Sequence, residues 1–101
     1  MIYTPDVWVK LEITSKQYGS VERILAGWYG GWAGSDSWKL NSGIVSITET
    51  AEAYVFAGVT GSTYVCHKTC QKLSSYTSGV LESLSKTIKE NGASIKIVKH
   101  V

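Results

Sequence analysis

The stretch Val7–Ile13, which reads VWVKLEI, decides the fold because its apolar residues alternate along the chain. Every second side chain is aliphatic, as on the buried face of a β-strand. Lys10 and Glu12 fall on the opposite face, and so does the large aromatic side chain of Trp8. A tryptophan among charged residues implies a second, partly covered surface. We therefore expect a strand with one face in the core and the other partly in contact with further structure.

The residues that follow predict more strands of the same kind. A turn over residues 15–20 that contains Gly19 predicts an antiparallel hairpin between this strand and a second one over residues 21–28. Three further apolar runs with short turns between them are typical of an antiparallel meander, over residues 44–49, 52–57 and 62–66. The C-terminal residues 93–100 carry Ile95 and Ile97 on one face and predict a closing strand.

One helix is expected over residues 78–90, with Thr77 or Ser78 as its N-cap and Asn91-Gly92 at its end. Its apolar residues repeat with the helical period and form one face, made of Val80, Leu81, Leu84 and Ile88. The sequence thus predicts an α+β fold, a curved antiparallel sheet of about five or six strands with one C-terminal helix packed on it and a final strand. Because no linker, repeat or low-complexity tract interrupts the chain, we expect a single domain over residues 1–101.

Composition and charge exclude several classes of function. The chain has 10 Lys and Arg against 8 Asp and Glu, and its basic residues are scattered, so it lacks the basic stripe of a duplex nucleic-acid binder. No apolar run is long enough to cross a membrane, and the first residues do not resemble a secretory signal. We therefore expect a cytoplasmic protein that binds neither duplex nucleic acid nor a membrane and keeps its two cysteines reduced.

The run Cys66–Cys70, CHKTC, is the part of the sequence that most resembles a metal site. With His100 as a fourth ligand it could hold a soft metal, but structural zinc sites need a second complete pair of ligands, and we predict no metal. Nucleophilic catalysis by Cys66 with His67 is also disfavoured, since neighbours on a strand point to opposite faces. Catalysis by Asp36 with His67 would need a fold that brings them together, so an enzyme is the less favoured interpretation.

The segment Trp28–Gly43, WYGGWAGSDSWKLNSG, carries the strongest functional signal. Its glycines do not form a phosphate loop, because no Gly-Lys-Ser/Thr follows and the segment leads into strands rather than a helix. Flat aromatic side chains with short polar ones suit a nucleobase, a sugar or a protein partner. The alternative is a self-packed loop whose tryptophans fill one end of the sheet.

A ligand-binding interpretation assigns each part of this segment a role. The side chains that would stack on a base or wall its pocket are Trp28, Tyr29, Trp32 and Trp38. The side chains that would read polar edges of the base are Asp36, Ser37 and Asn41. Lys39, with Lys68 or Arg23, would meet phosphate. No cofactor is expected, and because small chains commonly complete such sites between subunits, we expect a homo-oligomer.

The central motif, Trp28–Trp32 followed by Gly34 and Asp36–Ile44, resembles a family of small uncharacterised proteins of tailed bacteriophages. Residues 61–68, GSTYVCHK, and 76–79, YTSG, are similar to the same pattern. The resemblance implies an accessory phage protein made in the cytoplasm of the infected bacterium. Small phage proteins of this kind often block host defences.

These observations lead to three functional hypotheses. The favoured one is a non-catalytic phage accessory protein that binds a small anionic ligand and sequesters a nucleotide immune signal of the host. The second is a protein-interaction module that inhibits a host enzyme or defence factor through the aromatic segment. The third is a small nucleotide-degrading enzyme that uses Asp36 or His67. The sequence leaves the ligand, the oligomeric state and the host target open.

Overall fold

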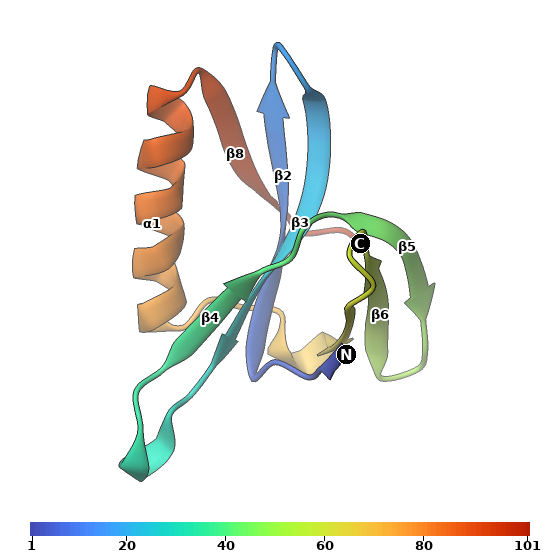
Figure 1. The fold of residues 1–101 in the computed structure, drawn as a ribbon. Coiled ribbons are helices and arrows are strands. Elements are labelled where there is room, and N and C mark those ends of the chain that lie inside the picture. The colour runs from blue at the N-terminus through green and yellow to red at the C-terminus, as the bar shows by residue number, and fades with distance from the viewer.

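The computed structural model describes residues 1–101 except the side chain of Ala33. The described chain forms three layers, a helix, a central sheet and an outer sheet (Figure 1). The central sheet has, in spatial order, the strands β4 (Ser37–Leu40), β3 (Gly19–Trp28), β2 (Val7–Ser15) and β8 (Ala93–Val98). The outer sheet has, in spatial order, the strands β1 (Ile2–Tyr3), β7 (Thr63–His67), β6 (Ala53–Gly58) and β5 (Ile44–Glu49). The helix α1 and two short 3-10 turns complete the fold, at Ser75–Glu90 (α1), Gly31–Ala33 (η1) and Lys68–Cys70 (η2).

Strand β2 lies in the middle layer and is covered on both faces over Val7–Leu11. On one face Leu11 is fully buried in a cluster with Val9 and Leu25, onto which apolar residues of α1 pack. On the other face Trp8 is buried against Phe56 of the outer sheet. The second covered surface that the sequence implied for Trp8 is therefore present, and it is more complete than expected.

The fold class is confirmed in its main features, but the number and arrangement of strands differ from the prediction. The chain is α+β and mostly antiparallel, with one long helix and a final strand, yet the described residues form eight strands in two sheets. The glycines of residues 29–43 predict a loop with short extended pieces, but the structure has strand β4 there. The two-residue strand β1, which pairs in parallel with β7, has no alternation that a sequence could reveal.

Asn41 and Gly43 mark the point where the chain leaves the central sheet for the outer one. Gly43 has a φ of 138°, which a residue with a side chain rarely adopts. Buried Asn41 accepts a hydrogen bond from the Ile24 N–H at 2.8 Å through its side-chain oxygen, and its amide donates to the Gly43 carbonyl at 3.3 Å. The side chain thus replaces the strand neighbour that Ile24 loses where β4 ends.

Helix α1 begins one turn before the predicted start. Its N-cap is Ser74, whose hydroxyl accepts from the Thr77 N–H at 3.1 Å, while the Thr77 hydroxyl accepts from the Ser74 N–H at 2.8 Å. This capping box satisfies two backbone donors that would otherwise lack partners. Thr77, predicted as a possible cap, is instead the third helical residue. The helix end at Asn91-Gly92 is as predicted, with Gly92 at a φ of 78°. No helix among the described residues is long and apolar enough to cross a membrane.

The first turn of α1 docks closely onto β3 because Gly27 has no side chain. A Cβ atom at Gly27 would lie 2.5 Å from Thr77 Cγ2 and 3.1 Å from Val7 Cγ2. Thr77 is 2% exposed, so it has no free space into which to move.

We predict that Gly27→Ala lowers the free energy of unfolding by about 1–3 kcal/mol, because the added methyl group pushes α1 off the central sheet. The matched control is Gly79→Ala on α1, where an added Cβ meets nothing within 4 Å. This control should raise stability by up to about 1 kcal/mol, as expected of alanine in a helix. Chemical denaturation measures both variants, and equal stability of Gly27→Ala and the wild type would contradict the docking described.

Candidate functional site

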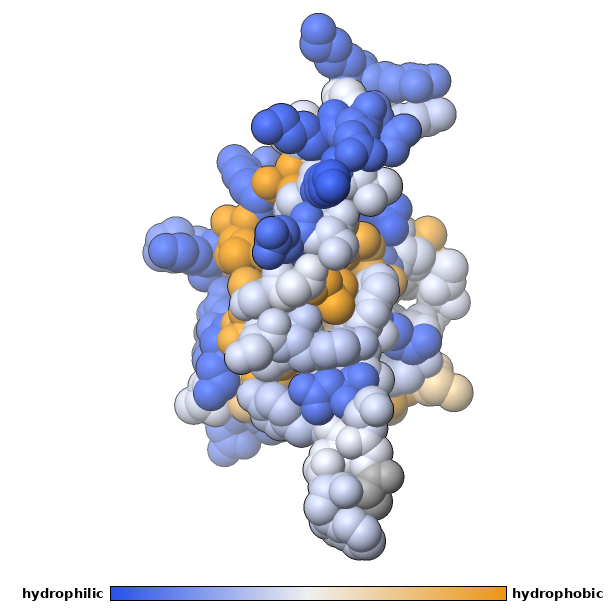
Figure 2. All heavy atoms as spheres, turned by 90° about the vertical axis from the view of Figure 1, so that its left-hand side faces the viewer, coloured by the Kyte–Doolittle hydropathy of each residue, from blue (hydrophilic) through white to orange (hydrophobic). Residues whose placement is uncertain are grey.

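The glycine-rich aromatic segment forms a projecting hairpin at the end of the central sheet. We call residues 28–38 the aromatic arm, and it extends beyond the body in Figure 1, at the lower left, and in Figure 2, at the bottom. Its last strand pair is Trp28 with Ser37, and η1 forms its tip. Asp36 closes the tip by accepting a hydrogen bond from the Gly30 N–H at 3.0 Å. At the base of the arm, Asp6 accepts from the Tyr29 N–H at 2.9 Å.

The four aromatic side chains predicted to wall one pocket point in different directions. Trp28 is half-buried against the core between the two sheets, and its Nε1 donates to the Thr4 carbonyl at 3.1 Å. Trp38 lies beside α1, where it lines a groove with Tyr76. Trp32 is at the tip and 99% exposed, and Tyr29 is 54% exposed. The described structure therefore does not bring these four side chains around a single cavity, and only part of the segment fills the core.

The predicted polar site residues are divided in the same way. Ser37 is exposed in β4, while the Asp36 and Asn41 side chains already hold the backbone of the tip and of the sheet junction. Lys39 points towards the outer sheet, with its Nζ 5.3 Å from the centroid of the Tyr3 ring. Of the eight predicted site residues, Lys39 and Asn41 share a cleft at the other end of the hairpin.

This cleft opens between the central sheet and the turn that joins β6 to β7. We call it the basic cleft, with a volume of about 350 Å³, and its polar lining residues are Arg23, Lys39, Asn41, Ser42, Thr60, Ser62 and Tyr64. The sequence suggested Arg23 as a phosphate contact, and in the structure Arg23 lines this cleft together with Lys39. Arg23 also lines a second pocket, between the β2–β3 turn and the end of α1. Thr60 and Ser62, from the turn, and Tyr64, from β7, were missed because they lie far along the chain and nothing in their local pattern marks them as facing Lys39.

The electrostatics of the basic cleft favour a negative charge. No Asp or Glu lines it, and neither Arg23 nor Lys39 forms an ion pair with any described side chain. The Nε atom of Arg23 is buried and has no hydrogen-bond partner in the described structure. Burial, with smaller contributions from Tyr3 and Cys66, raises the pKa of Tyr64 above its ordinary value, so its hydroxyl stays protonated. The cleft thus combines two cations with hydroxyl groups that can donate.

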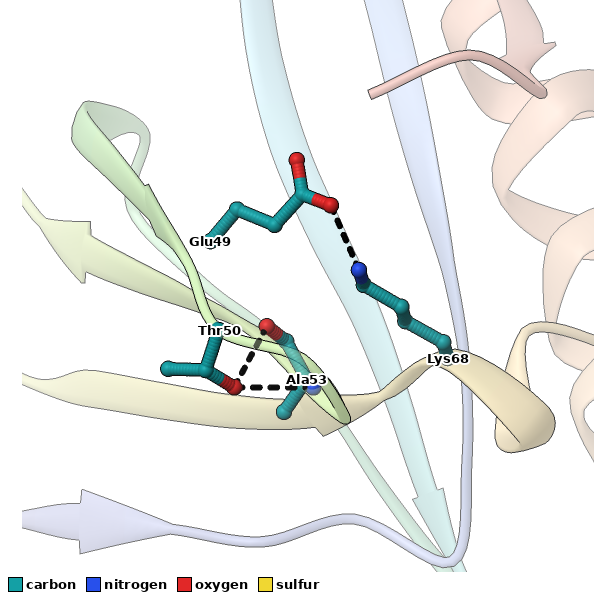
Figure 3. A network of polar contacts seen from close by, with 4 residues as sticks. All are labelled: Glu49, Thr50, Ala53 and Lys68. Carbon is teal, nitrogen blue, oxygen red and sulfur yellow. Dashed lines mark hydrogen bonds and ion pairs between the residues drawn. The ribbon is translucent and has the colours of Figure 1, made fainter.

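Lys68, the other suggested phosphate contact, lies away from this cleft. Its ammonium group pairs with Glu49 and sits 5.1 Å from the centroid of the Tyr54 ring. Figure 3 shows the pair beside the turn that Thr50 closes, where the Thr50 hydroxyl accepts from the Ala53 N–H at 3.0 Å. Lys68 therefore contacts residues of the outer sheet, and its charge is already paired with Glu49.

The side chains of the cysteine run lie in different environments in the structure. Cys66 is fully buried between the two sheets, while His67 is exposed, as expected of neighbours on a strand. Burial, and to a smaller extent Cys70, raises the pKa of the Cys66 thiol to about 12, so it stays protonated at neutral pH. Among the described residues no three His, Cys, Asp or Glu side chains are grouped to hold a metal ion.

Comparisons of the chain with protein-family models, curated proteins and solved structures each give no match. The functional argument therefore rests on the geometry of the chain itself. The resemblance to proteins of tailed bacteriophages stays a prediction.

We predict that Ellman's reagent at pH 8 titrates one thiol of the folded protein quickly and the second only after unfolding. The slow thiol is Cys66, which is buried and protonated, and the fast one is Cys70, which is partly exposed. Cys70→Ser should remove the fast reaction and leave the slow one. Two equally fast thiols in the folded protein would contradict the position assigned to Cys66.

Proposed function

We propose that the protein binds a small anionic ligand, with a phosphate or similar oxyanion group, in the basic cleft. The observation that carries this proposal is the pair of cations, Arg23 and Lys39, which line one cleft without a carboxylate. The Nε atom of Arg23 is buried without a hydrogen-bond partner, and an acceptor that reached this atom would recover the free energy that it costs. An oxyanion supplies such acceptors, and its hydrogen bonds to charged donors are the strong ones.

The size and walls of the cleft agree with a compact ligand. Its volume of about 350 Å³ is at the lower end of the range for small-molecule sites, which is about 300–1,000 Å³. Ser42 and Thr60 already contact each other, with their hydroxyl oxygens 3.2 Å apart, and Ser62 also lines the cleft. These hydroxyl groups can donate to the oxygens that Arg23 and Lys39 leave free.

The nucleotide character of the ligand stays a prediction. Trp28, Trp32 and Trp38, which were expected to stack on a base, do not line the basic cleft, whereas Tyr64 does. The support for an anion is thus stronger than the support for a base. Neither a carboxylate nor a histidine is among the lining residues, which favours binding over hydrolysis. In the phage context that the resemblance implies, such binding would sequester a host signal.

Isothermal titration calorimetry with inorganic phosphate, pyrophosphate, ATP and cyclic dinucleotides tests the proposal. At least one of these anions should bind the wild-type protein, and neutral adenosine should bind more weakly than its phosphates. Arg23→Gln and Lys39→Gln should each weaken binding by about tenfold or more, as expected for a lost charged hydrogen bond.

The matched control is Lys68→Gln, which removes the same charge as Lys39→Gln but at a lysine paired with Glu49 outside the cleft. It should leave the affinity within about twofold, since a distant exposed charge is screened. Melting temperatures of all three variants confirm that they are folded. No binding of any anion to the wild type, or an equal loss in Lys68→Gln and Lys39→Gln, would overturn the proposal.

A further inference from the structure

The tip of the aromatic arm presents an aromatic surface that nothing in the described chain covers. Trp32 is 99% exposed, and Tyr29, at the start of the arm, is 54% exposed. A fully exposed tryptophan on a projecting hairpin leaves a large apolar area in water, and tryptophan is the residue type most enriched among interface anchors. Trp32 is therefore the side chain of the arm best placed to anchor a partner.

A groove at the base of the same hairpin offers a place for such a side chain. It runs between β4 and α1, has a volume of about 630 Å³, and is mainly apolar through Trp38, Tyr76, Val80 and Leu84. No charged residue is among those that line it. On the α1 side, the small residues Gly79 and Ser83 leave room in the groove. Figure 2 looks onto this side of the molecule, where the arm projects below and apolar atoms are exposed on the body above it.

The groove and the tip cannot meet within one molecule. Trp32 is almost fully exposed, so its own groove leaves it uncovered. The groove begins at Trp38 and follows α1 as far as Thr87, away from the tip (Figure 1). Strand β4 is also at the edge of the central sheet, so its outer backbone groups have no strand neighbour.

We propose that two copies of the chain associate through their aromatic arms, each placing Trp32 in the groove between β4 and α1 of the other. The tip lies at the end of the arm, whereas the groove begins at the base of the arm, at Trp38, and continues along α1. A two-fold axis perpendicular to the arm, near its base and beside β4, therefore brings each tip onto the other groove. The same operation places the two β4 edges side by side and antiparallel, where they can extend the central sheet across the dimer.

A second copy fits the arm better than a lipid surface does. Residues 28–38 contain one charged side chain, Asp36, and no lysine or arginine, whereas hairpins and helices that bind anionic membranes carry basic residues beside their aromatic ones. The groove that would receive Trp32 is uncharged and apolar as well. The chain therefore carries both halves of one complementary contact.

Sedimentation velocity on the full chain tests the proposal. The wild type should be in monomer–dimer equilibrium, and Trp32→Ala should raise the dimer dissociation constant by about thirtyfold or more, as expected for loss of an anchor residue. The Trp32→Ala monomer should have the same melting temperature as the wild type at a concentration low enough for it to be monomeric. The reason is that Trp32 packs against nothing within the protomer. Tyr18→Ala is the matched control, since Tyr18 is 83% exposed in the turn between β2 and β3, away from the arm.

A mixing experiment separates the two halves of the contact. Ser83→Trp fills the groove and keeps the arm, whereas Trp32→Ala keeps the groove and loses the anchor. Each variant alone should be mainly monomeric, and an equimolar mixture should form a heterodimer through one intact tip and one intact groove.

Three results would overturn the proposal. One is a wild-type protein that stays monomeric into the millimolar range. This result counts against the proposal also where the monomer binds a different protein or lipid vesicles through Trp32. Another is a dimer that Trp32→Ala leaves intact. The third is the absence of a heterodimer in the mixture of the two folded variants.

Discussion

The burial of Trp8 between the two sheets is the contact on which the rest of the structure depends. Its indole Nε1 donates to the His67 carbonyl of β7 at 2.7 Å, and its ring meets Phe56 of β6 edge to face at a centroid distance of 5.6 Å. The same strand carries Leu11, fully buried on the opposite face beneath α1. One stretch of β2 therefore fastens the outer sheet on one side and the helix on the other. Lys10, between them in sequence, is accommodated because its Nζ pairs with Glu22 Oε2 at 3.1 Å.

The position of both candidate surfaces follows from this arrangement. All of β2 pairs with β3, and the last partner of β2 on β3 is Gly27. Beyond that point β3 and β4 continue without the support of β2 and become the aromatic arm. At the other end of β4, the Asn41 junction sends the chain into the outer sheet. Lys39 and Arg23 thereby lie opposite the turn between β6 and β7.

The sequence predicted the parts of the fold that depend on local patterns. The alternation of Val7–Ile13 gave β2 and the unusual position of Trp8, and Asn91-Gly92 gave the end of α1. The division into two sheets was not predictable, because periodicity shows which side chains are buried but not which strands pair. A two-residue strand such as β1 carries no periodic signal at all, and the Ser74 cap was missed because serine and threonine recur throughout that region.

The candidate site was predicted in its residue types more than in its geometry. Trp28 and Trp38 lie on opposite faces of the hairpin because strand residues alternate, and the register of the hairpin, which the glycines obscured, decides which face each one takes. The short polar side chains Asp36 and Asn41 were expected to read a ligand, yet they bond to nearby backbone, as such residues often do in turns. Lys39 and Arg23 line one cleft only because the fold brings the β6–β7 turn against the central sheet.

Amide hydrogen exchange measured by NMR tests most directly whether β2 holds the layers together. If it does, the amides of Trp8, Val9 and Leu11 exchange only through global unfolding, with an exchange free energy equal to that from denaturation. Amides of the arm tip, residues 30–35, should show little protection. Amides of β6 or α1 that stay protected while those of β2 exchange at a lower free energy would contradict this account.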